Sequence, residues 1–505
     1  MKAILNLKRL GEYVAGQKGK SKKVVLAHGC FDLLHPGHIR HLRAAKAHGD
    51  ILVVTVTPDK FVKKGPGRPV FSEQLRLETL AALEFVDAVA LNEWPTAVET
   101  IRLLEPDIYI KGAEYRNSNN DPTGEISNEK KAVESIGGKM EFTDEITFSS
   151  TSLLNEHFDV FPAGAEAYLR GIAQKYDPDD VRALFEPMKN WTVAVIGDTI
   201  IDEYSYVRPM GRVEKAPIVA CRYLDTELFA GGILAVANHI SNFVKRVELV
   251  TVAGDDDLFS RIEPVLSPNI EVHLYVRPDG PTTLKRRYLH KDDLRKMFAL
   301  EFMNDKPIPP NTESTILKDL PQILRDSDLT VVADFGHGAV TERIIGETKR
   351  HSGFLAVNAQ TNSSNFGFNP ITRYLTADFI SIDETELRIA TKGRFDDVAD
   401  MLGVLRKTVD CPRINITLGA NGSHYSTRDG DFVVPALAGD VLDTVGAGDA
   451  VLSVLSLCTA AGFPDEIIPL IGNCAGAIAA NILCNETSIN RPELFKMIKS
   501  TLSWG

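Results

Sequence analysis

Residues 24–38 read VVLAHGCFDLLHPGH, and this stretch decides the fold of the first part of the chain. It opens with a short apolar run, which is typical of a buried strand. A helical pattern then runs from Gly37 to His48 and ends at Gly49, and a second apolar run covers Ile51–Val56. A strand, a helix and a second strand in this order predict a βαβ unit and a parallel sheet.

The turn between the first strand and the helix carries a first candidate site. A helix start presents unpaired N–H groups and a partial positive charge. His35 and His38 add side-chain donors three residues apart on one face, and Gly37 leaves room for a phosphate near the backbone. The same histidines could instead cap the helix or lie on the surface. In a strand–turn–helix context we favour a cradle for a nucleoside triphosphate.

Composition and charge narrow the class of protein. The 505 residues are 44% hydrophobic and 25% charged, which is typical of a soluble globular chain with two large domains or about three smaller ones. The 56 basic and 68 acidic side chains give a net charge of −12. This balance argues against a nucleic-acid partner, while small anions held at local sites remain possible.

Three further patterns indicate a cytoplasmic protein with no membrane partner. The longest uncharged stretch, residues 467–484, contains Pro469 and two asparagines, so we expect a buried helix rather than a membrane span. The first twenty residues lack the apolar run of a signal peptide. The six cysteines form no CxxC pair and no zinc-like spacing, which indicates reduced thiols.

The alternating pattern of strands and helices restarts near Asn190. Strand-like runs recur at residues 192–196, 247–252, 329–333, 354–357, 379–382 and 414–418. They predict a second, larger α/β domain. We therefore expect a first domain over residues 1–160, a linker over 161–189 and a second domain over 190–505.

A second candidate site lies at residues 442–449, which read LDTVGAGD and precede an apolar helical run. The backbone amides of Gly446, Ala447 and Gly448 can face a developing phosphate charge. Asp449, at the same helix start, can accept the proton of an attacking hydroxyl. The alternative is a glycine turn with a capping aspartate.

The stretch GCFDLLHPGH at residues 29–38 resembles the HxGH signature of the nucleotidyltransferase superfamily. Residues 64–70, 74–76, 81–87, 106–107, 111–115 and 149–151 extend the resemblance toward the Rossmann-like transferase domain of bifunctional heptose-phosphate kinase/adenylyltransferases. The resemblance implies that a sugar 1-phosphate attacks the α-phosphorus of ATP, or of CTP, and that pyrophosphate leaves. His35 and His38 would hold the leaving phosphates. The implied nucleotide and phosphate contacts are Gly29, Phe31, Gly37, Lys63, Lys64, Arg76, Lys111, Ser149, Ser150 and Thr151.

The stretch DTVGAGD resembles the signature of ribokinase-like carbohydrate kinases. That resemblance implies a second domain of ribokinase-like α/β fold, with Asp449 as the base and Gly446–Gly448 as the anion hole. It also implies an ATP site that includes Thr417, Gly419 and Gly422, and Glu386 near Mg²⁺. The implied sugar contacts are Asp198, Asp202, Gly231, Gly232 and Lys285. The transferase domain comes first, the reverse of the order in the bifunctional heptose enzymes.

Some residues depart from the kinase pattern. Ala235 stands where the family has an asparagine that touches the sugar, Asp383 stands where an asparagine is usual, and residues 358–362 replace an aspartate-led segment. We favour a bifunctional enzyme that phosphorylates heptose 7-phosphate and makes a nucleotide-activated sugar, and we expect it to form a homodimer. The alternatives are another sugar or polyol phosphate with CTP, or a kinase domain kept as a nucleotide-binding scaffold. The expected partners are sugar phosphates and nucleoside triphosphates.

Overall fold

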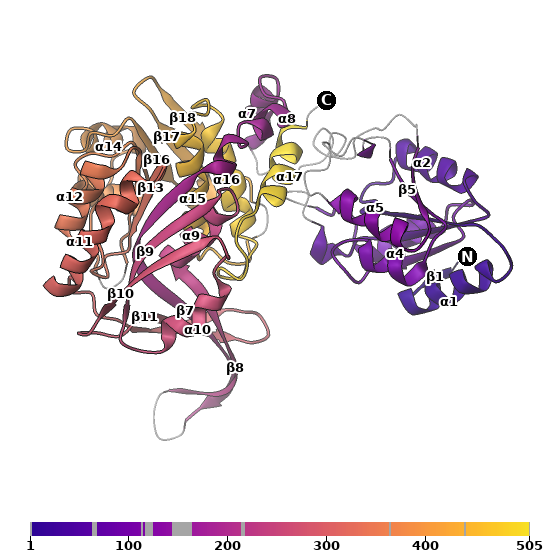
Figure 1. The fold of residues 1–505 in the computed structure, drawn as a ribbon, viewed down its shortest axis with the longest axis horizontal. Helices are drawn as coiled ribbons and strands as arrows, with labels where there is room; N and C mark the ends of the chain where they lie inside the picture. The colour runs from indigo at the N-terminus through magenta and orange to yellow at the C-terminus, as the bar shows by residue number, and fades with distance from the viewer. Residues whose placement is uncertain are drawn as a thin grey trace. The chain divides into compact units, whose positions relative to one another are not determined.

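The computed structural model describes residues 3–62, 68–112, 115–116, 125–143, 164–213, 218–362, 365–438 and 441–503. The chain divides into two compact units (Figure 1). Met1–Pro178 and Arg491–Gly505 form unit 1, and Asp179–Asn490 form unit 2. The expected linker over residues 161–189 contains helices α7 (Ala165–Ala173) and α8 (Pro178–Ala183). The domain limits read from the sequence remain proposals.

Unit 1 is built on a parallel sheet with strand order β1-β4-β3-β2-β5-β6. The strands are β1 (Ala3–Leu5), β2 (Val24–Gly29), β3 (Ile51–Val56), β4 (Ala88–Leu91), β5 (Ile108–Lys111) and β6 (Lys139–Phe142). The helices are α1 (Leu7–Lys18), α2 (Pro36–Ala47), α3 (Glu73–Ala81), α4 (Val98–Leu104), α5 (Glu125–Ser135), α7 and α17 (Arg491–Leu502), with a 3₁₀ turn at Asp59–Phe61. The predicted βαβ unit is confirmed as β2-α2-β3.

Helices cover both faces of this sheet. Leu42 of α2 and Leu77 of α3 pack into the core on one face. Leu10 of α1 and Ile101 of α4 pack into the core on the other. From β2 the chain adds β3 and β4 on one side, and it then adds β5 and β6 on the opposite side. The order of strands thus reverses between β2 and β5, and ligands of such sheets bind beyond the carboxyl ends of the strands at this point.

Unit 2 is built on a longer sheet with strand order β10-β9-β7-β13-β14-β15-β16-β17-β18. The strands are β7 (Thr192–Arg212), β9 (Arg246–Gly254), β10 (Ile270–Arg277), β13 (Leu329–Asp334), β14 (Leu355–Ala359), β15 (Phe379–Asp383), β16 (Arg413–Thr417), β17 (Ser423–Ser426) and β18 (Asp431–Val434). The strands from β10 to β16 are parallel, and β17 and β18 are antiparallel. The expected α/β architecture with two successive domains is confirmed.

A second sheet, which we call the side sheet, shares β7 with the long one. Residues 199–212 of β7 pair antiparallel with β8 (Val219–Gly232) and parallel with β11 (Thr283–His290), which pairs with β12 (Lys296–Phe302). The outer ends of β7 and β8 extend away from the rest of unit 2 as a hairpin (Figure 1). The sequence predicts only the first five residues of β7, because Gly197, Asp198 and Thr199 interrupt the apolar run.

Helices also cover both faces of the long sheet. They are α9 (Ile233–Ser241), α10 (Leu258–Ile262), α11 (Pro310–Arg325), α12 (Glu342–His351), α13 (Glu384–Thr391), α14 (Val398–Leu405), α15 (Ala447–Ala460) and α16 (Ile468–Ala479), with 3₁₀ turns at Pro187–Asn190, Glu263–Val265, Ile371–Arg373 and Gly419–Asn421. Most side chains of α16 are buried, which confirms the expected buried helix. No helix in the described part of the chain is long and apolar enough to cross a membrane. All six cysteines are free thiols.

Candidate active sites

The first site forms where α2 begins, beyond the carboxyl end of β2. His35 is the N-cap residue, and its Nδ1 accepts the N–H of Gly37 at 3.1 Å. Burial lowers the pKa of His35, so the ring stays neutral. Because Nδ1 is the acceptor, the proton of the neutral ring lies on Nε2, which can donate to a phosphate oxygen. Capping and phosphate binding are therefore compatible roles for His35.

Two aromatic rings contact His38. The centroids of the His35 and His38 rings lie 4.0 Å apart, and Phe31 meets His38 edge to face at 5.4 Å. Phe31 has a positive φ of 49°. A Cβ at Gly29 would lie 3.2 Å from the Phe31 ring, so the glycine leaves room for that ring. Gly29 and Phe31 thus position the two histidines.

Lys111 lies at the carboxyl end of β5, next to β2 in the sheet. Its Nζ lies 3.0 Å from a carboxylate oxygen of Glu129. Burial lowers the pKa of His28 to about 3 and that of His41 to about 4, and the charge of Lys111 lowers both further. The structure therefore brings Lys111 within electrostatic reach of α2, at the point where the strand order reverses.

Arg76, an expected phosphate contact, binds backbone carbonyls in the structure. Its side chain is fully buried, and its guanidinium donates to the carbonyls of Cys30 (2.5 Å), Thr57 (2.9 Å) and Phe71 (3.0 Å) and to Asp59 Oδ1 (2.5 Å). These bonds tie α3 to the residues that follow β2 and β3. Because these partners engage all three guanidinium nitrogens, Arg76 positions the loops around the site. Its expected contact with nucleotide phosphates stays a prediction.

The first site also includes expected contacts that the structure does not describe, and one aspartate that the sequence motifs do not single out. Lys63, Lys64, Ser149, Ser150 and Thr151 lie outside the described residues. Asp32 was not singled out, although it lies within the quoted HxGH stretch. Its Oδ1 accepts the N–H groups of Val70 (2.7 Å) and Phe71 (3.1 Å). Asp32 therefore holds the segment that leads into α3 against the start of the site.

The second site centres on Asp449, in the first turn of α15. Gly446 precedes this helix with a φ of +85°, and a Cβ there would clash with Asn485. Burial and, to a smaller extent, the charge of Asp202 raise the pKa of Asp449 to about 7, against the opposing charge of Lys285. A carboxylate that titrates near neutral pH at a helix start fits a general base.

Asp202 comes from β7 and forms a buried ion pair with Arg287 of β11. A Cβ on Gly231 of β8 would clash with an oxygen of Asp202, so only glycine lets the carboxylate lie against this strand. Gly232, with a φ of +53°, then turns the chain into α9. Arg287 was missed, because a basic residue on a strand gives no motif signal.

Lys285 lies opposite Asp202 in the parallel register of β11 and β7. Its side chain is buried, and burial lowers its pKa, whereas Glu301, Asp202 and Asp198 raise it. Among the residues that the structure describes, no hydrogen bond or ion pair holds its ammonium group. Lys285 is thus a cation available to a ligand beside Asp449.

Asp198, an expected sugar contact, binds backbone amides in the structure. Its carboxylate accepts the N–H groups of Phe335 (3.0 Å), His337 (3.4 Å) and Ala339 (2.9 Å), from the loop after β13. Burial raises its pKa, and these amides oppose the shift. The first role of Asp198 is therefore to shape this loop, although its side chain also lines a cavity described below.

Glu386 and Asp383 form a capping box at the start of α13. Asp383 accepts the N–H of Glu386 at 2.7 Å, and Glu386 accepts the N–H groups of Asp383 (2.8 Å) and Thr361 (3.0 Å). Burial raises the pKa of Glu386 to about 8, and Asp383 and then Asp449 raise it further. Asp383, noted as a departure from the family, has a structural role here, and Glu386 lies within electrostatic reach of Asp449.

The expected ATP residues lie on the same edge of the sheet. Thr417 pairs with Asp383 in the register of β16 and β15. Gly419 and Gly422 both have positive φ, and a Cβ on Gly422 would clash with the carbonyl of Val434. The carboxyl ends of β15 and β16 thus place the glycine turn beside Glu386.

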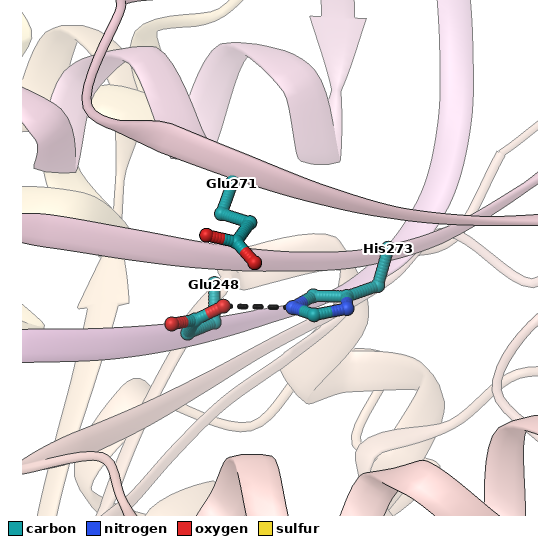
Figure 2. A group of neighbouring side chains, drawn as sticks. All are labelled: Glu248, Glu271 and His273. Atoms are coloured by element: carbon teal, nitrogen blue, oxygen red, sulfur yellow. Dashed lines mark hydrogen bonds and ion pairs between the residues drawn. The ribbon is translucent and has the colours of Figure 1, made fainter.

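A separate charged cluster lies on the edge strand β10 and its neighbour β9 (Figure 2). His273 Nε2 lies 2.7 Å from a Glu248 oxygen, and Glu271 lies beside them. Arg246 pairs with Glu248 and with Glu271, each at 2.5 Å. The guanidinium already neutralises both carboxylates, so we assign this cluster to the stability of the sheet edge rather than to a metal.

Comparison with known proteins gives the class of each unit. The family model of cytidylyltransferase-like proteins matches residues 26–156. The model of the pfkB family carbohydrate kinases matches residues 191–488, which is more than half of the chain. The chain belongs to the pfkB family of carbohydrate kinases, and a cytidylyltransferase-like domain precedes the kinase domain.

Particular relatives match in parts. The bifunctional protein HldE of Trichlorobacter lovleyi is 39% identical over 155 residues, which are 30% of this chain and 30% of that protein. HldE of Bradyrhizobium diazoefficiens is 28% identical over 313 residues, 60% of this chain and 62% of that protein. The chain thus spans less than two thirds of the length of these relatives. Phosphofructokinase-2 from Escherichia coli in complex with potassium shares the fold (TM-score 0.50, 14% identity, 62% of this chain and 98% of that chain).

Proposed function

We propose that the chain is a bifunctional enzyme of nucleotide-sugar synthesis. Unit 2 would phosphorylate a sugar phosphate with ATP, and unit 1 would transfer a nucleotidyl group to a sugar 1-phosphate and release pyrophosphate. Support comes from the two families and from the relatives named as bifunctional HldE. The free thiols fit an enzyme of the cytoplasm.

The observation that carries the kinase proposal is Asp449 at the start of α15, with its pKa raised to about 7 between Asp202 and Lys285. The sugar hydroxyl gives its proton to Asp449 while its oxygen attacks the γ-phosphorus, and ADP leaves. The amides of Ala447 and Gly448 face the developing charge. Lys285 supplies a positive charge beside the reacting groups.

Glu386 and Asp383 would hold a Mg²⁺ ion together with the phosphates of ATP. Their carboxylates fit a divalent cation, because the negative charges of Asp383 and Asp449 raise the pKa of Glu386 and a cation would offset this repulsion. When bound, the ion neutralises phosphate charge. The capping box holds both carboxylates in place without it.

In unit 1 the sugar 1-phosphate is already ionised, so its attack on the α-phosphorus needs positioning and charge neutralisation rather than a strong base. His35 would donate from Nε2 to the leaving phosphates, and His38 would lie beside it. Lys111 would add positive charge at the end of β5. Lys63, Lys64 and the hydroxyls of residues 149–151 remain proposed contacts.

The identity of the sugar is open to a second candidate. Ala235 is buried in α9, three residues after Gly232. It lacks the side-chain amide that the family resemblance implies at this position. A sugar or polyol phosphate other than heptose 7-phosphate, with CTP in unit 1, would fit this change.

The test is product analysis by mass spectrometry. Heptose 7-phosphate, fructose 6-phosphate, ribose and glycerol 3-phosphate are each supplied with Mg²⁺ and ATP, and the matching sugar 1-phosphates with ATP or CTP. We expect a phosphorylated product and a nucleotide-activated sugar, with heptose favoured. No phosphorylated product from any acceptor, in a protein that binds ATP, would favour the scaffold alternative.

A further inference from the structure

The loop after β13 places a histidine in a small cavity beside residues 198–199 of β7 and the carboxyl ends of β9 and β13. The cavity is lined by Asp198, Thr199, Val252, Ala253, Arg277, Pro281, Thr282, Thr283, Ile308, His337 and Ala339. The side chain of His337 is 3% exposed. Neither of its ring nitrogens has a hydrogen-bond partner among the residues that the structure describes.

The position of His337 is fixed by its backbone. Its N–H donates to Asp198 at 3.4 Å, and its carbonyl accepts from Arg277 at 3.2 Å. Gly336 and Gly338 flank it with φ values of +70° and +92°, and a Cβ on either glycine would clash with a neighbour. This loop is therefore held tightly, and the imidazole cannot reach another partner through a change of its backbone.

Two unpaired nitrogens in the interior are costly, because burial removes their hydrogen bonds to water. Native proteins satisfy most such groups, so an exception calls for an explanation. Other neighbours of the cavity are already committed: Arg277 binds Asp279 and backbone carbonyls, and Thr282 donates to Asp256. His337 is the lining side chain with both of its polar atoms uncommitted.

Charge decides which ligand group fits. Burial and, to a smaller extent, the charge of Lys285 lower the pKa of His337 to about 4, against the opposing charges of Glu301 and Asp305. A neutral imidazole offers one donor and one acceptor, which matches a hydroxyl group. A phosphate would need donors only, and it would lie beside the carboxylate of Asp198, which lines the same cavity. Lys285 acts on both His337 and Asp449, so the cavity lies within its reach.

We propose that His337 is a specificity-determining residue that binds a hydroxyl group of the kinase substrate, away from the hydroxyl that is phosphorylated. This inference rests on the proposed kinase function of the Asp449 site. It predicts strong selection for substrates that carry this hydroxyl, because an analogue without it leaves the buried imidazole unpaired.

The experiment combines substrate and protein changes. Calorimetry measures the binding of heptose 7-phosphate, fructose 6-phosphate and ribose to the full chain, followed by mono-deoxy analogues of the tightest binder. The variants are His337→Leu, which removes both nitrogens, and His337→Gln, which keeps a donor and an acceptor. His351→Leu, at the end of α12 and beside Glu347, is the control. Circular dichroism checks folding, and kcat/KM is measured in parallel.

In the wild type, we expect one deoxy analogue to bind about 10²-fold more weakly than its parent. The affinity of His337→Leu for the parent compound should fall to the level at which the wild type binds the deoxy analogue. Removal of that hydroxyl from the compound should then cost the variant no further affinity. His337→Gln should recover about tenfold, and His351→Leu should match the wild type. If His337→Leu does not fold, a partial loss of discrimination in His337→Gln, confined to that one hydroxyl, decides the question.

Unchanged affinity for the parent in a folded His337→Leu protein would overturn the inference, as would a deoxy profile equal to that of the wild type. A third outcome is that discrimination between the parent and the deoxy analogue depends on His337, but the wild type forms no phosphorylated product. That outcome would support the inference and overturn the proposed kinase function. A wild type that binds none of the three compounds overturns both.

Discussion

At the scale of single residues, the account rests on the protonation of Asp449. Its carboxylate accepts a proton only when ionised, so with a pKa of about 7 the kinase kcat/KM should rise with pH through about 7 and level off above it. Lys285 lowers this pKa. Lys285→Met should therefore shift the rise to higher pH as well as lowering the rate. Initial rates from pH 5 to 9 test this, and a flat profile would contradict it.

A second residue-scale prediction concerns His38, beside the N-cap of α2. His38→Ala should reduce pyrophosphate release by about 10²-fold, because it removes a fixed group from the place where charge develops. Kinase activity should persist. His48→Ala, at the other end of the same helix and beside Glu141, is the control. Near-normal pyrophosphate release from His38→Ala would remove this residue from the site.

At the scale of elements, Arg76 links α3 to the ends of β2 and β3. Arg76→Lys keeps the charge but loses the planar fork, so some of the carbonyls of Cys30, Thr57 and Phe71 lose a donor. We expect a loss of about 1–3 kcal/mol in the stability of unit 1. Arg102→Lys, an exposed residue of α4, is the control. Thermal unfolding measures the difference, and equal midpoints for Arg76→Lys and wild type would rule out this anchoring role.

The elements also show what the sequence can and cannot predict. The apolar runs in the sequence correctly predict β2, β3 and β9, because buried parallel strands are apolar on both faces. The sequence does not predict residues 199–212 of β7 as strand, because charged residues such as Asp202 and Glu203 interrupt the apolar run although they are buried in the structure. The sequence motif suggests that Arg76 binds phosphate, because a motif does not show whether a basic side chain is buried and bound by backbone carbonyls. His337 was missed because its signal is only a glycine on each side, after a strand end.

At the scale of the whole molecule, one face of the side sheet is apolar and exposed. Phe298, Leu300 and Phe302 alternate along β12 and are 52%, 44% and 43% exposed. This face fits the dimer expected from the sequence, since such patches mark interaction sites. Phe298→Glu with Phe302→Glu should convert a dimer to a monomer in light scattering. Phe395→Glu, exposed elsewhere on unit 2, is the control. A wild-type monomer would contradict this prediction.

The central claim is that unit 2 holds a kinase site that is separate from the transferase site of unit 1. The most direct measurement is the activity of Asp449→Asn, which keeps the size of the side chain but removes the basic oxygen. The account predicts a fall of about 10²-fold or more in ATP-dependent phosphorylation, with ATP binding, folding and pyrophosphate release from a supplied sugar 1-phosphate unchanged. A folded Asp449→Asn protein that phosphorylates its sugar at the wild-type rate would contradict it.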